Sequence, residues 1–341
     1  MSPTLMGGVQ SVWTPRLRRF LARSWPERIR AAGLQARAIY PKLPIPVRIS
    51  PDLWFLAWQD HLGDHVLAGD YEEPELAFVR QFVRPGMVVL DIGANEGFYT
   101  LFLARCVGVH GSVVSFEPSQ RERRRLRVNL WINFIKNVRV EASALSAQEG
   151  ELSFFVVETG ETGCNSLRPP AVEGPTRQVS VTSITLDLFL RRNSMRRIDF
   201  MKIDVEGAEW GVLQGAVTAL RTAPRPLLMI EVSDLRTRPW GYHAQEIAKC
   251  LRDLDYELFR PLALGKLEPM DVMDIKDGSD FNVMAAPRER SPEMSSFLVG
   301  REAEEHLRSK VKAASKPGSL ERIWASAKRD AWRFSKESGV A

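Results

Sequence analysis

Three carboxylates in this 341-residue sequence follow apolar, strand-like stretches: Asp91, Glu117 and Asp204. Helix-like segments separate these stretches, and strands that alternate with helices are typical of a mostly parallel α/β sheet. The carboxyl ends of parallel strands meet at one edge of the sheet, where open α/β folds bind their ligands. We therefore expect the three acids to face one crevice, where they could attract a cation, accept hydrogen bonds from hydroxyls or take a proton.

The turn after the first of these strands reads Gly93-Ala-Asn-Glu-Gly97 and opens a helix at Phe98. A dinucleotide pyrophosphate is typically held by the spacing Gly-x-Gly-x-x-Gly at a free helix N-terminus, whereas this turn has Gly-x-x-x-Gly. Asp91 and Glu96 would repel a pyrophosphate and would suit a cationic ligand, such as the amine or sulfonium of S-adenosylmethionine. The alternative is that the two glycines only form a tight turn.

The other two strand ends predict different roles for their acids. Glu117 stands where an acid can accept hydrogen bonds from both hydroxyls of a ribose, and Pro118 helps to start the next helix. Asp204 and Glu206 could orient a substrate hydroxyl, accept its proton or hold a divalent cation.

Five blocks of the sequence, taken in order, resemble the FkbM family of S-adenosylmethionine-dependent methyltransferases: residues 91–100, 116–118, 144–146, 185–187 and 202–209. The last block, Lys-Ile-Asp-Val-Glu-Gly-Ala-Glu, is specific in this order. The resemblance implies a Rossmann-like class I methyltransferase fold, an α/β architecture with a mostly parallel seven-stranded sheet and helices on both faces. It also implies O-methylation of a hydroxyl on a sugar, a glycan or a secondary metabolite by in-line methyl transfer.

The resemblance places S-adenosylmethionine on one set of residues: Asp91, Gly93, Asn95, Gly97, Phe98, Glu117, Pro118, Ser143, Ala144 and Asp204. Asp204 is the first candidate for the general base or for the group that orients the acceptor, followed by Glu206 and Glu72. An oxygen-ligand set of Asp204, Glu231 and Asp234 could hold magnesium, but no spacing requires it, so no metal site is expected. The polar loop 158–168 is either a specificity loop or a mobile surface hairpin.

The charge of the chain is concentrated at its two ends. Residues 1–50 carry nine basic residues and one acidic residue, and residues 288–341 carry twelve basic and eight acidic residues, so the middle of the chain is net acidic. An acidic central domain argues against a nucleic-acid partner. We expect a basic amphipathic N-terminal extension with a proline-rich linker (1–50), the methyltransferase domain (51–287) and a charged helical C-terminal extension (288–341). The two ends suit either peripheral contact with an anionic membrane or packing on the domain or on a second subunit.

Other features limit the class of protein. No apolar run is long enough to span a membrane, and the start of the sequence lacks the pattern of a secretory signal. Three scattered cysteines favour a reducing compartment, so we expect a cytoplasmic enzyme, at the inner membrane face if the ends bind lipid. Two alternatives stay open, an NAD-dependent nucleotide-sugar oxidoreductase and an inactive cofactor-binding scaffold. The sequence gives no oligomeric state, and the expected partner is a small molecule or glycan with a free hydroxyl.

Overall fold

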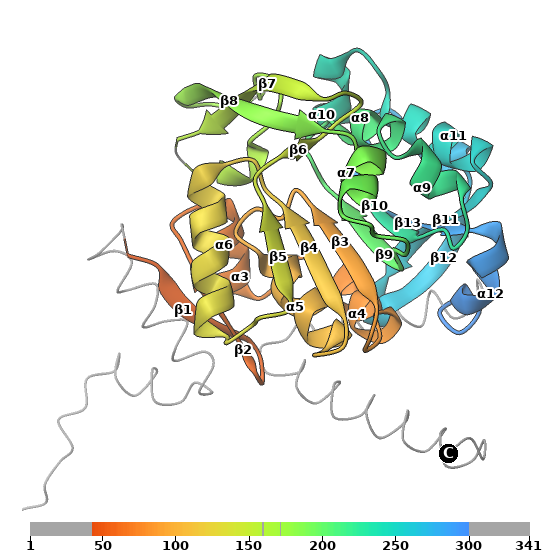
Figure 1. The fold of residues 1–341 in the computed structure, drawn as a ribbon, viewed down its shortest axis with the longest axis horizontal. Helices are drawn as coiled ribbons and strands as arrows, with labels where there is room; N and C mark the ends of the chain where they lie inside the picture. Colours follow the sequence, from red (N-terminus) through yellow and green to blue (C-terminus); the bar gives the residue numbers. More distant parts are fainter. Residues whose placement is uncertain (1–42, 159, 171, 300–341) are drawn as a thin grey trace, which may run out of the picture.

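The central sheet has eight strands in the order β12-β11-β13-β10-β9-β3-β4-β5 (Figure 1). The structure is a computed structural model that describes residues 43–158, 160–170 and 172–299. Five strands are parallel: β10 (Leu227–Ser233), β9 (Phe200–Ile203), β3 (Val88–Ile92), β4 (Ser112–Phe116) and β5 (Val138–Glu141). Beyond β10 the pairings are antiparallel, through β13 (Asp280–Pro287), β11 (Tyr256–Leu262) and β12 (Lys266–Met270).

The central strands are mostly apolar because helices cover both faces of the sheet. Val89 of β3 packs into one core with helices of the first face: α3 (His61–Ala68), α4 (Glu73–Phe82), α5 (Phe98–Val107) and α6 (Gln120–Ile132). Its neighbour Leu90 points into the second core, under α7 (Leu186–Arg192), α8 (Glu209–Gln214), α9 (Val217–Arg221) and α11 (Ala244–Asp253). The expected α/β class, with a mostly parallel sheet and two helical layers, is therefore confirmed.

Smaller elements surround this sheet. A hairpin of β1 (Ile45–Ser50) and β2 (Leu53–Ala57) packs on the first core, and a second sheet is formed by β6 (Ala144–Leu145), β8 (Thr176–Ile184) and β7 (Gly150–Val157). Short helical turns complete the described chain: η1 (Thr162–Cys164), α10 (Asp234–Thr237), η2 (Arg238–Trp240), η3 (Ala263–Gly265), η4 (Val272–Asp274), η5 (Arg288–Arg290) and α12 (Ser291–Met294). None of the helices in the described ranges is both long and apolar enough to cross a bilayer.

Three departures from the expected elements concern the sheets and one helix beside them. The sheet has an eighth strand, β12, beside the seven that were expected. The helix expected over 208–221 divides into α8 and α9 at Gly215, where a Cβ would stand 2.1 Å from the carbonyl oxygen of Ser146. The strand expected over 138–144 divides into β5 and β6, which belong to different sheets.

The two expected extensions are described only where they meet the domain. The boundary at residue 50 falls between β1 and β2, which pair with each other. At the other end, Phe297 is buried and its ring lies 4.9 Å from that of Phe78, so the domain continues past residue 287. The amphipathic helices expected at residues 13–40 and in the C-terminal tail lie outside the described residues.

Candidate active site

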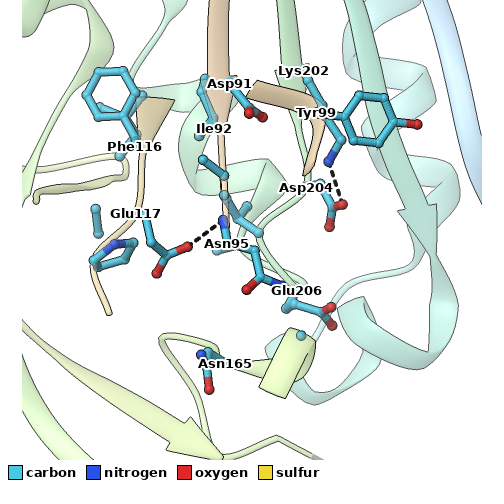
Figure 2. Close-up of a pocket in the computed structure, with 18 of the residues that line it drawn as sticks. Asp91, Ile92, Asn95, Tyr99, Phe116, Glu117, Asn165, Lys202, Asp204 and Glu206 are labelled. Carbon is cyan, nitrogen blue, oxygen red and sulfur yellow. Dashed lines mark hydrogen bonds and ion pairs between the residues drawn. The ribbon is translucent and has the colours of Figure 1, made fainter. Parts of the chain in front are cut away.

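The crevice of the fold opens where the strand order reverses, between β3 and its neighbours β4 and β9. Ile92 at the end of β3 is in register with Phe116 of β4 and with Ile203 of β9. The residues that follow these three strands therefore reach the carboxyl edge together. They line a cavity that is partly open to solvent (Figure 2).

Ten of the twelve predicted site residues line this cavity: Asp91, Gly93, Asn95, Phe98, Glu117, Pro118, Ser143, Ala144, Asp204 and Glu206. Gly97 and Glu72 do not. Gly97 caps α5 with a φ of 88°, and a Cβ there would stand 2.8 Å from Leu126 Cγ, so this glycine serves helix packing. Glu72 lies behind the wall, where Oε2 accepts a hydrogen bond from the hydroxyl of Tyr99 at 2.5 Å.

Gly93 holds two strand ends together. Its φ is 83°, and a Cβ at this position would stand 1.8 Å from the carbonyl oxygen of Asp204. The absence of a side chain therefore lets the end of β3 lie directly against the end of β9. This tight contact brings Asp91 and Asp204 to the same cavity. Glycine is therefore required at position 93 by the contact between the two strand ends, and not only to make room for a ligand.

Glu117 is fixed by two backbone amides. Its Oε2 accepts a hydrogen bond from Asn95 N at 2.8 Å, and its Oε1 accepts one from Ser119 N at 2.7 Å (Figure 2). Burial, helped by Glu122, raises the pKa of Glu117 to about 8. Each carboxyl oxygen keeps a second lone pair, so the group can exchange hydrogen bonds with a diol without having to reorient.

Asp91 is fully buried at the floor of the cavity. Its Oδ2 accepts a hydrogen bond from Thr100 Oγ1 at 2.5 Å, whereas Oδ1 has no hydrogen-bond partner among the described residues. Burial raises the pKa of this carboxyl. A buried acceptor without a partner costs free energy unless a ligand or a water satisfies it. Together with the diol-like site at Glu117, this orphaned oxygen fits a ligand with a cationic or N–H-bearing end.

A lysine that sequence reasoning did not select stands at the centre of the acidic wall. Lys202 Nζ lies 2.6 Å from Asp204 Oδ2 and 4.8 Å from the centre of the Tyr99 ring (Figure 2). Side chains two residues apart in a strand share a face, so the spacing of Lys202 and Asp204 could have identified the pair. Lys202 also lies near Glu72 and Asp91, and together the three carboxylates outweigh burial and raise the pKa of the lysine.

Glu206 provides the second carboxylate of the acidic wall. Its backbone is left-handed, with a φ of 56°, and its Oε2 lies 2.7 Å from Arg236 Nε. Burial raises the pKa of Glu206 to about 8, even though Arg236 opposes the shift. Ser166 Oγ donates a hydrogen bond to the Glu206 carbonyl at 2.8 Å, which ties the residue to the loop that follows β7.

The loop predicted over 158–168 closes the open side of the cavity. Four of its residues line the cavity: Thr162, Gly163, Asn165 and Leu167. Asn165 Oδ1 accepts a hydrogen bond from Val157 N at 2.8 Å, which holds the loop against β7. Burial raises the pKa of the Cys164 thiol to about 12, so it is a poor nucleophile.

The oxygen ligands considered for magnesium do not come together at the cavity. Neither Glu231 nor Asp234 is among its lining residues. Asp234 instead accepts hydrogen bonds from the backbone amides of Ala244 and Gly278, at 2.9 and 3.0 Å. Asp234 therefore has a structural role at the start of α11.

A doubly wound sheet with acids at three neighbouring strand ends defines a Rossmann-like α/β fold with its ligand site at that edge. Residues 91–258 match the model of the methyltransferase FkbM domain. The chain therefore carries a methyltransferase domain of the FkbM family.

Two curated relatives and one solved structure illustrate the range of similar proteins. The chain is 27% identical to the AMB antimetabolite synthetase of Pseudomonas aeruginosa over 209 residues, which are 51% of this chain and 10% of that protein. It is 25% identical to Methyltransferase 1 of Beauveria bassiana over 143 residues, 37% of this chain and 57% of that protein. It thus spans only part of the length of either relative. An S-adenosylmethionine-dependent O-methyltransferase from Thermotoga maritima aligns with 66% of this chain and 70% of its own, at 16% identity and a TM-score of 0.37.

Proposed function

We propose that this protein is an S-adenosylmethionine-dependent O-methyltransferase that acts on a hydroxyl of a sugar, a glycan or a secondary metabolite. The observation that carries the proposal is the division of one cavity into two ends. Glu117 stands at one end, the carboxylates of Asp204 and Glu206 stand at the other, and Asp91, with its unpartnered oxygen, lies between them (Figure 2). The first end suits the ribose of the donor, Asp91 suits its amine, and the second end suits a hydroxyl that loses a proton.

Separate residues would hold each part of the cofactor. Glu117 would hold the ribose hydroxyls, and the Asp91 carboxyl would accept from the amine of the methionyl part. Ser143 and Ala144, which also line the cavity, would contact the adenine. S-adenosylmethionine supplies a methyl group that is already activated by its sulfonium. The protein then has to align the acceptor, exclude water and remove one proton.

The two acids of the acceptor end have different surroundings. Asp204 is paired with Lys202 at 2.6 Å, and this ion pair holds its carboxyl group in place. Glu206 has a pKa of about 8, close to the pH at which a general base works best. We therefore assign proton removal to Glu206 and orientation of the hydroxyl to Asp204, the reverse of the order in which the sequence ranked them.

An acceptor screen with methyl-labelled S-adenosylmethionine tests this function. Purified full-length protein is incubated with hydroxylated sugars, glycans and polyketide-type compounds, and the products are analysed for a new O-methyl ether. Transfer to a hydroxyl that is lost in Glu206→Gln supports the proposal. Transfer to nitrogen or carbon, or transfer that Glu206→Gln leaves unchanged, contradicts it. Cofactor binding without transfer to any acceptor favours the scaffold alternative.

A further inference from the structure

A second, much smaller hollow adjoins the main cavity. Glu206 lines both spaces. The hollow lies between the loop after β7 and the segment after β10, and its other polar and aromatic side chains are Ser166, Arg168, Arg236 and Trp240. An acceptor whose hydroxyl reaches Glu206 can therefore place a small group at the mouth of this hollow.

The hollow is electropositive although the domain around it is acidic. Arg168 and Arg236 are its two cations, and Glu206 is the only carboxyl group in its lining. Glu206 Oε2 lies 2.7 Å from Arg236 Nε, so this carboxyl compensates Arg236 and leaves the charge of Arg168 as the excess positive charge of the lining. The next acid along the loop, Glu161, is not in the lining.

The arginine at the mouth of the hollow is held in place. The guanidinium of Arg168 lies 5.1 Å from the centre of the Trp240 ring and donates a hydrogen bond to the Pro239 carbonyl at 3.1 Å. Trp240 itself rests on Gly207, where a Cβ would come within 2.6 Å of the indole Nε1. A stacked guanidinium loses less freedom when it binds an anion than a free side chain does. Arg168 is thus positioned to receive one.

We propose that this hollow binds an anionic group, a carboxylate or a phosphate, carried by the methyl acceptor. Guanidinium groups recognise both anions through paired N–H donors. The inference rests on the proposed function in one respect, because it takes the anion to belong to the molecule that is methylated. It narrows the acceptor to acidic or phosphorylated carbohydrates and metabolites and disfavours neutral sugars.

The binding step can be measured without knowing the acceptor. The full chain, labelled with nitrogen-15, is titrated with inorganic phosphate and separately with acetate, and the indole N–H signals of its nine tryptophans are followed. The Trp240→Phe variant identifies the signal of Trp240. We expect a saturable shift of that signal, weakened about tenfold in Arg168→Gln. Arg177→Gln is the matched control, since Arg177 is an exposed arginine of β8 that pairs with Glu158 outside the hollow.

Every outcome of the titration has a defined meaning. Tighter binding of phosphate indicates a phosphorylated acceptor, and equal or tighter binding of acetate indicates a carboxylate. No saturable shift, or equal binding by wild type and Arg168→Gln, overturns the inference.

A parallel titration with S-adenosylhomocysteine separates this inference from the proposed function. If the cofactor binds and the anions do not, only this inference fails. If the anions bind and the cofactor does not, the proposed function fails and the hollow remains an anion site.

Discussion

The ammonium group of Lys202 lies 2.6 Å from Oδ2 of Asp204, inside a wall formed mostly by acids. Only 4% of the Lys202 side chain is exposed, and it also lies near Glu72 and Asp91. A buried charge is tolerated when opposite charges compensate for its lost hydration. Lys202 therefore allows the carboxyl groups of Asp204, Asp91 and Glu72 to lie close together, and Asp204 is the one of the three that takes part in the proposed chemistry.

Removing this lysine should destabilise the fold. Lys202→Met leaves the surrounding carboxyl groups buried without their cation, and breaking a buried pair in this way costs about 3–5 kcal/mol. The carboxyl pKa values in the variant rise, so its folded state takes up protons and the penalty shrinks as the pH falls. Urea denaturation at pH 7.5 and pH 5.5 measures both effects. Lys249→Met on the exposed face of α11 is the control, and a loss below 1 kcal/mol for Lys202→Met would contradict the role given to it.

The contact between Gly93 and the Asp204 carbonyl makes a second prediction about stability. Gly86→Ala and Gly93→Ala impose nearly the same strain, because φ is 86° at Gly86 and 83° at Gly93. A Cβ at Gly86 meets nothing within 4 Å, whereas a Cβ at Gly93 stands 1.8 Å from a backbone oxygen. We expect Gly86→Ala to cost about 1–2 kcal/mol and Gly93→Ala clearly more. Equal unfolding free energies would show that the strand ends can separate without cost.

The sequence predicted the parts of the fold that have a strong local pattern. Helix α5 begins and ends where expected, at Phe98 and Val107, because a glycine turn precedes it and Gly108 follows it. The strands β3 and β9 are buried and mostly apolar, as expected for a sheet covered on both faces, and each contains one buried charged residue. Helix α3 and strand β8 were missed. The burial pattern of β8 alternates weakly, and its register is set by pairing with β7.

The candidate site was predictable where an acid ends a strand, and less so elsewhere. Asp91, Glu117 and Asp204 were found because strand topology alone brings them to one edge. Gly97 and Glu72 were assigned to the site from their place in the motif, but neither lines the cavity. Gly97 packs closely against Leu126, and Glu72 accepts a hydrogen bond from Tyr99. Arg236 was missed because its approach to Glu206 depends on the tertiary fold.

The pH dependence of turnover should report the basicity of Glu206. A carboxyl with a pKa of about 8 is mostly protonated at pH 7 and becomes the base form only above pH 8. With saturating cofactor, kcat/KM should therefore rise with pH and level off above about pH 8. Arg236 lowers this pKa, so Arg236→Gln should move the rise to higher pH. A profile that is flat from pH 6.5 to 9 would exclude Glu206 as the base.

Substitution of the two acids separates their roles. Glu206→Gln should lower turnover by a factor of about 10²–10⁴, the usual contribution of a general base, and should abolish the rise with pH. Asp204→Asn should lower turnover while keeping the rise, with cofactor affinity within a few fold of the wild type. If Asp204→Asn removes the pH dependence and Glu206→Gln keeps it, the assignments must be exchanged.

Glu117 should dominate the affinity for the donor. Glu117→Gln keeps the size of the side chain but replaces one carboxyl oxygen with an amide that cannot accept from the backbone and the ribose. We expect about tenfold weaker binding of S-adenosylhomocysteine, measured by equilibrium dialysis. Glu149→Gln, on an exposed turn, should bind as the wild type does. Unchanged binding in Glu117→Gln would place the ribose elsewhere.

The central claim, that this cavity holds S-adenosylmethionine, is tested most directly by calorimetric titration. Purified full-length protein is titrated with S-adenosylmethionine, with S-adenosylhomocysteine and, for comparison, with NAD. We predict micromolar binding of both sulfur compounds and no heat from NAD. Binding of NAD in place of the sulfur compounds, or binding of none of them by protein shown to be folded and free of retained ligand, would contradict the account.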